Sequence, residues 1–348
     1  MDLASILISE DNTILNSLKK LNEIRDISRL ILFVHNQKNE LIGSLTDGDI
    51  RRSLLLDGDI NKPVGLICNR DFNYEKETQG YIDLRKYEKK NIKILPLVNE
   101  NQELIRIIDL EKQKAELPLE CMIMAGGRGK RLSPLTDTIP KPMLLLGDKP
   151  IIEHNIDRLI AFGIQKFYIS VKYLGEQIKD YFGDGSSKGI SIEYIWEDEP
   201  LGTAGALSLV EQFSTQYVLL MNSDLFTDVD FEDLYLDLVN QNADMAVASI
   251  EYKVDVPYAV FETNENKVID FKEKPSYVYH SNAGVYILKK ELIHKIPKNE
   301  FYDITDLMEK VVKEGGTLLH NPILGFWIDI GNPVDYKKAQ EFIKHLKS

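Results

Sequence analysis

From residue 119 onward, short apolar runs alternate with segments of helical periodicity. The apolar runs are LECMIMA, KFYISVKY, ISIEYIW, QYVLLMNSD and ADMAVASI, and the helical patterns include KPIIEHNIDRLIAFG and FEDLYLDLVNQN. Strands that alternate with helices usually pair in parallel, with the helices covering both faces of the sheet. The pattern therefore predicts an α/β fold with a mostly parallel sheet, whose ligands bind at the carboxyl ends of the strands.

A glycine-rich turn, MAGGRGKRLS at 124–133, directly follows the first of these apolar runs. A turn of successive backbone N–H groups is suited to an anion. The dinucleotide fingerprint G-x-G-x-x-G does not fit, because Leu132 stands in the place of its third glycine. A P-loop does not fit either, because Lys130 is followed by Arg131 instead of Ser or Thr.

A second cation lies close in sequence, since Pro140–Lys141–Pro142 places a lysine on a stiffened backbone. Two cations and a turn of amides could together hold a triphosphate. The sequence thus favours nucleotide phosphate chemistry at this strand end.

The front of the chain contains a duplication. ILFVHNQKNELIG (31–43) aligns without gaps on ILPLVNENQELIR (94–106), and Ile, Leu, Glu, Leu and Ile recur at matching places. Each copy is an apolar run, a polar turn and a second apolar run, which is typical of a hairpin. Chance similarity of two hairpins is the alternative, but the ungapped match favours two copies of one small unit.

The segment after the first copy predicts a capped helix, with Thr46 at its start and Gly58 at its end. It resembles the cystathionine-β-synthase-type (CBS) module, whose G-x-x-T-x-x-D segment is matched by Gly43, Thr46 and Asp49. The resemblance implies a small α+β CBS pair over residues 1–115 that binds a regulatory adenine or guanine nucleotide through Thr46 and Asp49.

The second copy departs from that motif, because Arg106, Asp109 and Lys112 replace its Gly, Thr and Asp. We therefore expect at most one nucleotide cleft per chain. Two alternatives stay open. In one, Thr46 and Asp49 only cap a helix. In the other, the CBS pair only assembles the chain into a homo-oligomer. We expect a homo-oligomer in either case.

Composition limits the partners and the compartment. The chain has 348 residues, enough for two domains, and a formal net charge of −13, which argues against a nucleic-acid partner. Its two cysteines, Cys68 and Cys121, have no metal-like spacing. The start MDLASILISEDN resembles neither a signal peptide nor a membrane span. We expect a cytoplasmic protein with no membrane partner.

The stretch GGRGKRLSPLTDTIPKPM resembles the G-G-x-G-T-R-L-x-P-L-T…P-K-P-M signature of the sugar-1-phosphate nucleotidyltransferases. Further motifs of that family follow in order, namely EPLGTAGAL (199–207), NSD (222–224), FKEKP (271–275), SNAGVYIL (281–288) and FWIDIGNP (326–333). The resemblance covers residues 119–348. It implies a Rossmann-like catalytic domain that condenses a nucleoside triphosphate with a sugar 1-phosphate, giving an NDP-sugar and pyrophosphate.

The resemblance also implies a role for each matching residue. Arg131 and Lys141 would hold the triphosphate and stabilise the leaving pyrophosphate, and Asp224 and Asp329 would bind Mg²⁺. The remaining substrate contacts would come from Gly126, Gly127, Gly202 and Thr203 on the nucleotide and from Glu273, Lys274 and Asn282 on the sugar phosphate.

Three residues depart from the family pattern. Lys130 and Asn332 each replace a threonine, and Ala259 replaces a glycine next to the sugar, so we expect an unusual sugar. The loop EPLGTAGAL resembles that of guanylyl-transferring members, which favours GTP. The CBS pair in front of this catalytic type resembles the glucosamine-1-phosphate guanylyltransferases. Glucosamine 1-phosphate is therefore the first expected sugar and mannose 1-phosphate the second.

Three other functions stay open at this point. The enzyme could transfer a uridylyl, thymidylyl or cytidylyl group instead, or the chain could be a nucleotide sensor without catalysis. An NAD-type oxidoreductase is disfavoured by the glycine spacing.

Overall fold

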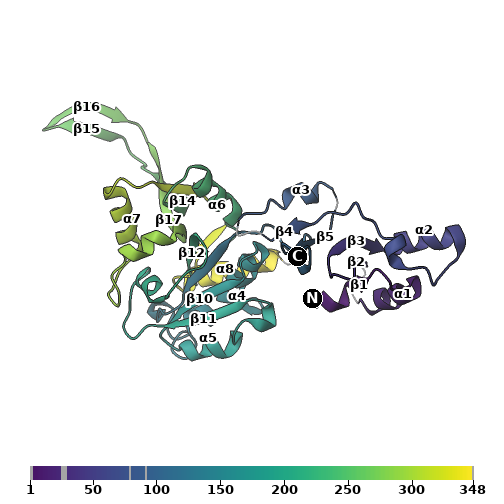
Figure 1. Ribbon diagram of the computed structural model, residues 1–348. Helices are drawn as coiled ribbons and strands as arrows, with labels where there is room; N and C mark the ends of the chain where they lie inside the picture. The colour runs from purple at the N-terminus through teal and green to yellow at the C-terminus, as the bar shows by residue number, and fades with distance from the viewer. Residues whose placement is uncertain (1–2, 25–29, 78–79, 91, 347–348) are drawn as a thin grey trace. The chain divides into compact units, whose positions relative to one another are not determined.

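The computed structural model describes the whole chain except residues 1–2, 25–29, 78–79, 91 and 347–348. The chain divides into two compact units, Met1–Glu116 and Leu117–Ser348 (Figure 1). We refer to them as the front unit and the rear unit and describe each by itself.

The front unit contains two three-stranded sheets of the same design. They are β1 (Leu7–Ser9), β2 (Ile31–His35) and β3 (Leu41–Thr46), and β4 (Glu75–Lys76), β5 (Ile94–Val98) and β6 (Leu104–Asp109). In each sheet the first strand pairs in parallel with the second, and the second pairs in antiparallel fashion with the third. The duplication seen in the sequence is therefore present in the structure.

The two hairpin turns agree in detail. The Asn36 Oδ1 accepts hydrogen bonds from the backbone N–H groups of residues 38 and 40 (2.9 and 3.0 Å), and Asn99 Oδ1 accepts from residues 101 and 103 (3.0 and 2.9 Å). Asn39 and Gln102 both have φ of 64°. The two turns also contact each other, because the Leu41 N–H donates to the Gln102 carbonyl at 2.8 Å.

The helices of the two copies differ. The first copy has α1 (Ile14–Glu23) and, after its hairpin, α2 (Asp47–Asp57), which ends at Gly58 in a left-handed conformation as predicted. The second copy has only the one-turn α3 (Arg85–Glu88), and among the described residues no helix follows β6 before the rear unit begins. The second copy thus keeps the hairpin but lacks the longer helices.

The rear unit is built on a seven-stranded sheet. Its strands, in spatial order, are β11 (Ser191–Trp196), β10 (Lys166–Val171), β7 (Leu119–Met124), β12 (Tyr217–Asn222), β17 (Ser276–Lys289), β14 (Met245–Asp255) and β18 (Leu318–Pro322). Four of the six strand pairs are parallel, and only β17 pairs in antiparallel fashion with both of its neighbours. The sequence prediction of a mostly parallel sheet is confirmed.

The central strands are covered on both faces. Met122, Val218 and Leu220 pack in one cluster with Leu307 of α7, and the alternate residues on these strands are equally buried. The helices are α4 (Ile151–Ala161), α5 (Gly175–Phe182), α6 (Phe231–Asn240), α7 (Ile304–Lys313) and α8 (Pro333–Leu346). None of the helices in the described part of the chain has the length and apolar character needed to cross a membrane.

Two short strand pairs lie beside the main sheet of the rear unit. They are β8 (Leu145–Leu146) with β9 (Lys149–Pro150), and β13 (Leu225–Thr227) with β19 (Trp327–Asp329). The second pair joins a segment that follows β12 to one near the C-terminus. It therefore brings together chain positions that are about a hundred residues apart in sequence.

A two-stranded ribbon projects from the sheet (Figure 1). The inner parts of β14 and β17 belong to the main sheet, while their outer parts pair only with each other, from Ile250–Ser281 to Asp255–Ser276. The ribbon ends in the hairpin β15 (Val260–Asn264) and β16 (Lys267–Lys272). We call residues 251–281 the arm. All six residues of β16 and four of the five in β15 are exposed.

Candidate active site

The glycine-rich turn packs against Lys141 of the Pro140–Lys141–Pro142 segment. It follows β7, and the Ala125 N–H donates to the Ser170 carbonyl of β10 at 2.9 Å. Gly129 has φ of +65°, and a Cβ at that position would lie 2.9 Å from the Lys141 Cβ. Only glycine fits such a left-handed, close approach. The turn is completed by Thr136, whose hydroxyl donates to the Gly129 carbonyl at 2.9 Å.

A pocket of about 460 Å³ opens above this turn, at the carboxyl ends of β7 and β12. Seven of the residues that the sequence predicted for the site line it, namely Gly126, Gly127, Arg131, Lys141, Gly202, Thr203 and Asp224. The pocket also holds the cations Lys130 and Lys172 and the carboxylate of Glu197. Positive charge predominates, which suits a polyphosphate. We call this cavity the nucleotide pocket.

The two predicted metal-binding aspartates lie side by side. Asp224 stands between β12 and β13, and its neighbour Leu225 pairs with Asp329 on β19. The Ile330 N–H also donates to the Asp224 carbonyl at 3.0 Å. The buried Lys141 donates from its ammonium group to Asp224 Oδ2. Because these residues come from three distant segments, their convergence is a result of the fold.

Asp329 has an unusual electrostatic environment. Its burial raises the pKa of the carboxyl group, and the charge of Asp224 raises this pKa further, while Lys141 and Arg131 lower it. A Cβ added at Gly331 would lie 3.3 Å from both an Arg131 guanidinium nitrogen and an Asp329 carboxylate oxygen. Two carboxylates that repel each other beside cations form a suitable site for a divalent ion.

These donors fit Mg²⁺, which takes one or two carboxylates and completes its coordination with substrate phosphates and water. Among the described residues, no group of three or more His, Cys, Asp or Glu side chains is placed to hold a metal ion. A two-carboxylate site that depends on the substrate for further ligands is consistent with both observations.

The loop around Gly202 is held against the start of α7. The Thr203 hydroxyl and N–H both donate to Asp303 Oδ1 at 3.0 Å, and the hydroxyl accepts from the Ile304 N–H at 2.9 Å. Gly202 has φ of +77°, and a Cβ there would lie 2.8 Å from the Tyr302 carbonyl. The Thr203 side chain therefore positions the loop, which leaves the backbone of this loop to face the pocket.

Sequence reasoning missed Glu197 and Asp303. Glu197 is buried at the pocket wall, where Oε1 accepts from the Ser170 hydroxyl and Oε2 accepts from the Leu201 N–H at 2.9 Å. Each is an acidic residue in a loop with no motif of its own to identify it. The only available signal was the position of Glu197 just before the EPLGTAGAL loop.

Four of the residues predicted for the rear unit do not line the nucleotide pocket, and one of them, Asp329, lies next to the Asp224 segment instead. Glu273 and Lys274 lie on the arm and are exposed, and Lys274 has φ of 46°. Asn282 lies where the arm joins the sheet, and its amide donates to the Tyr286 hydroxyl at 2.8 Å. The structure thus brings together the nucleotide residues and leaves Glu273 and Lys274 apart from them.

The departures from the family pattern have separate explanations. Asn332 caps α8, because its Oδ1 accepts from the N–H groups of Val334 and Asp335 at 2.9 and 3.1 Å. Lys130 lines the nucleotide pocket. Ala259 lies on the arm and is half-buried.

The two residues predicted to bind a regulatory nucleotide are engaged with each other in the front unit. Asp49 Oδ2 accepts from the Thr46 N–H and hydroxyl at 2.8 and 2.6 Å, which forms a capping box on α2. Thr46 also lines a cavity of about 320 Å³, whereas Asp49 lines a different one. Helix capping is therefore observed, and nucleotide binding remains a prediction.

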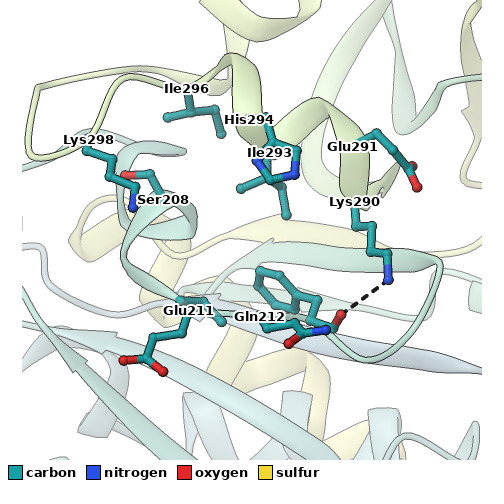
Figure 2. Close-up of a pocket in the computed structure, with 11 residues that line it drawn as sticks. Ser208, Glu211, Gln212, Lys290, Glu291, Ile293, His294, Ile296 and Lys298 are labelled. Carbon is teal, nitrogen blue, oxygen red and sulfur yellow. Dashed lines mark hydrogen bonds between the residues drawn. The ribbon is translucent and has the colours of Figure 1, made fainter.

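A separate cavity of about 500 Å³ lies elsewhere in the rear unit (Figure 2). It is formed by the segments 208–213 and 290–298, and the Lys290 ammonium group donates to the Phe213 carbonyl at 3.4 Å. Glu211, Glu291, His294 and Lys298 surround it. None of the site residues predicted from the sequence lines this cavity, so its size alone does not mark it as the active site.

The fold and the nucleotide pocket define a nucleotide-binding α/β domain with cations and paired carboxylates at its strand ends. The profile of the family described as Nucleotidyl transferase matches residues 120–345. The chain therefore belongs to this family and is an enzyme of the sugar-1-phosphate nucleotidyltransferase class. The profile of the CBS domain matches residues 2–56.

Among its relatives is the D-glycero-alpha-D-manno-heptose 1-phosphate guanylyltransferase of Aneurinibacillus thermoaerophilus, which is 34% identical over 65% of this chain and 99% of that protein. Another is the mannose-1-phosphate guanylyltransferase catalytic subunit beta of Danio rerio, 30% identical over 63% of this chain. A third is the UTP–glucose-1-phosphate uridylyltransferase of Synechocystis, 32% identical over 64% of this chain. The chain spans 62% of the length of each of these last two.

Solved structures agree with this family. A putative glucose-1-phosphate thymidylyltransferase from Bacillus anthracis matches 64% of this chain and 94% of its own, with 27% identity and a TM-score of 0.53. HddC from Yersinia pseudotuberculosis, complexed with GMP-PN, matches 64% of this chain and 99% of its own, with 26% identity and a TM-score of 0.51.

Proposed function

We propose that this enzyme transfers a guanylyl group from GTP to a hexosamine or hexose 1-phosphate. Glucosamine 1-phosphate is the first candidate and mannose 1-phosphate the second. The observation that carries the proposal is the convergence of Arg131, Lys141 and Asp224 in the nucleotide pocket, with Asp329 beside Asp224. Loss of catalysis would have removed the need for these groups, so their convergence also disfavours a sensor without catalysis.

The chemistry requires positioning and charge stabilisation. An oxygen of the sugar phosphate attacks the α-phosphorus of GTP, a new P–O bond forms, and the bond to the departing pyrophosphate breaks. Arg131, which lines the pocket, would hold the triphosphate and stabilise the charge that gathers on the pyrophosphate. Asp224 and Asp329 would hold Mg²⁺, which when bound neutralises phosphate charge. Lys141 both faces the pocket and compensates Asp224.

Two observations support guanine as the base. Two of the relatives described above are guanylyltransferases by name. In addition, guanine offers two adjacent N–H donors on one edge. The Glu197 carboxylate lines the pocket, where Oε1 accepts from the Ser170 hydroxyl and Oε2 from the Leu201 N–H. A carboxylate oxygen has a second lone pair, so this group retains capacity to accept from guanine.

The uridylyl-transferring alternative keeps one observation in its favour, the Synechocystis relative. Pyrophosphate release, measured over a matrix of nucleoside triphosphates and sugar 1-phosphates with Mg²⁺, decides between them. We expect the highest kcat/KM for GTP with glucosamine 1-phosphate. A higher value for UTP or dTTP with every sugar tested would refute the guanylyl assignment, and no release with any pair would refute the enzymatic one.

The front unit is proposed to bind a regulatory adenine or guanine nucleotide in the cavity that Thr46 lines. Lys93 also lines this cavity and supplies a cation. Calorimetric titration of the full chain with AMP tests the proposal. AMP is used because GTP, as a substrate, would also bind in the nucleotide pocket. We expect binding at one site per chain that is lost in Thr46→Ala. Absence of any heat of binding would leave the front unit with an assembly role.

A further inference from the structure

The cavity between the segments 208–213 and 290–298 has the composition of a small-molecule site (Figure 2). We call it the second cavity. Its volume of about 500 Å³ lies within the range of about 300–1,000 Å³ that ligand pockets occupy. Its apolar lining comes from core residues of the rear unit that are at most 9% exposed, namely Val210, Phe213, Ile293 and Ile296. The second cavity thus has a packed apolar lining.

The charged groups of the second cavity leave its cations uncompensated. Lys290 is half-buried, and its ammonium group donates to the neutral Phe213 carbonyl. Within the described part of the chain, neither Lys290 nor Lys298 forms an ion pair with a carboxylate. Figure 2 shows the Glu211 and Glu291 carboxylates directed outward, away from the space between the two segments. Because an ammonium group has three N–H donors, these lysines retain the capacity to bind an anion.

The second cavity and the nucleotide pocket are lined by the same two stretches of chain, 202–208 and 298–301. The nucleotide pocket takes Gly202, Thr203 and Phe301 from these stretches, and the second cavity takes Ser208 and Lys298. A ligand in the second cavity therefore contacts chain segments that also shape the nucleotide pocket.

Hydrogen bonds tie the two stretches together. The Ser208 hydroxyl donates to the Gly205 carbonyl at 2.7 Å and to the Pro297 carbonyl at 3.4 Å. The Gly205 N–H in turn donates to the Tyr302 carbonyl at 3.1 Å. A ligand that shifts Pro297 against Ser208 thus also shifts the backbone that follows Gly202.

We infer that the second cavity binds a small organic anion, an apolar body that carries a phosphate or carboxylate group, and that its occupancy changes the affinity of the nucleotide pocket. The apolar body packs against Phe213 and Ile293, and the anionic group accepts charge-assisted hydrogen bonds from Lys290 and Lys298. The inference goes beyond the proposed function, because it requires a nucleotide in the nucleotide pocket but no transfer reaction.

Methyl NMR of the full chain tests the site directly. The isoleucine δ1 methyl groups are labelled with carbon-13, and phenyl phosphate and phenylacetate serve as probes. Each anion should shift the Ile293 and Ile296 signals until they saturate, whereas the signal of Ile269, exposed on the arm, should not move. Phenol has the ring without the anionic group and should bind at least about tenfold more weakly. Unchanged Ile293 and Ile296 signals with both anions would overturn the site.

A double variant tests the charge of the site. Lys290→Ala combined with Lys298→Ala should lower the affinity for phenylacetate at least about tenfold, because hydrogen bonds between charged groups are lost. The matched control is Lys313→Ala, an exposed lysine at the end of α7, which should leave this affinity unchanged. Equal affinities of the double variant and the wild type would show that the cavity does not select an anion.

Calorimetry tests the coupling between the two sites. The affinity for GTP is measured with and without saturating phenylacetate, and the affinity for phenylacetate with and without GTP. Phenylacetate is used because the nucleotide pocket would also accept phenyl phosphate. Both affinities should change by the same factor, at least about fivefold, because coupling is reciprocal. In the double variant the factor should fall to about one, since phenylacetate no longer binds.

The outcomes separate this inference from the proposed function. Shifts of Ile293 and Ile296 with an unchanged affinity for GTP would overturn the coupling. Absence of GTP binding would refute the guanylyl assignment alone, because the methyl shifts still report the second cavity, and the coupling is then measured with UTP.

Discussion

The nucleotide pocket and the arm contain the two groups of residues that one reaction is expected to use, but they are built in opposite ways. In the pocket, Lys141 is 8% exposed and Asp224 and Asp329 are brought together by strand pairing. On the arm, Glu273 and Lys274 are exposed on a ribbon that only its own two strands hold in place. The nucleotide half of the site is thus preorganised by buried strand pairing, whereas the residues predicted for the sugar half lie on an exposed ribbon.

The largest expected effect concerns the pocket. Asp224→Asn and Asp329→Asn should each lower kcat at least about a hundredfold, because a metal clamp on the transferring phosphoryl group supplies several kcal/mol. Pyrophosphate release at saturating substrates and Mg²⁺ measures the loss. The control is Asp180→Asn on an exposed face of α5, which should retain wild-type turnover. Near-normal turnover of both pocket variants would remove the metal assignment.

The next effect concerns the arm. Lys274→Ala should raise the KM for the sugar 1-phosphate about thirtyfold, because a hydrogen bond to a charged group contributes about 1.5–3 kcal/mol. The KM for GTP should change less than about twofold, since the nucleotide pocket is intact. Lys272→Ala, also exposed on the arm, is the matched control and should alter neither constant. Equal increases in the KM values for the sugar 1-phosphate and for GTP would show that Lys274 does not act on the sugar phosphate alone.

A third effect tests whether Glu197 recognises the base of the nucleotide. Glu197→Gln should lower the ratio of kcat/KM for GTP to that for UTP about tenfold, because an amide cannot accept from both guanine donors as a carboxylate can. The ratio is the informative quantity, since Glu197 also holds the Leu201 N–H. A parallel fall for both nucleotides would assign Glu197 a purely positional role. Glu193→Gln, exposed on β11, should leave the ratio unchanged.

The smallest effect concerns the front unit, which contains neither the nucleotide pocket nor the arm. Asp49→Ala removes the capping box of α2 and should lower the free energy of unfolding of the front unit by about 1 kcal/mol. In the absence of added nucleotide it should leave kcat and both KM values unchanged. Thermal unfolding followed by circular dichroism, together with the kinetic assay, measures both. A change in either KM would show that the front unit influences one half of the site directly.

The sequence predicted the sheet, its strands and the pocket residues because these depend on local patterns. Apolar runs such as those of β7 and β12 identify buried strands, and Gly129 and Lys141 belong to motifs with fixed spacing. The closeness of Asp224 and Asp329 depends on the pairing of β13 with β19. A single sequence does not encode that pairing in any local pattern, so the resemblance to a family had to supply it.

The arm could not be predicted in the same way. In this part of the chain only the run ADMAVASI was identified as a strand, and alternation of apolar and polar residues does not distinguish a ribbon packed on its own domain from one that projects. The ribbon projects because β14 and β17 stay paired beyond Ser249, the last residue of β14 that pairs with β18. Thr46 and Asp49 show the converse case, because one spacing served both for helix capping and for a nucleotide motif, and the structure shows only the cap directly.

The matched turns of the front unit have a consequence for how it folds. The backbones of Glu40 and Glu103 form an antiparallel β-bridge, and the Leu41 N–H donates to the Gln102 carbonyl. The two hairpins are therefore paired with each other through their backbones. Contacts between segments this distant form late and break together, which makes the two copies one cooperative unit. A truncation after residue 56, the end of the CBS match, would therefore leave a half-module without its stabilising counterpart. Hydrogen exchange should show both hairpins opening at the same rate, as a single cooperative unit.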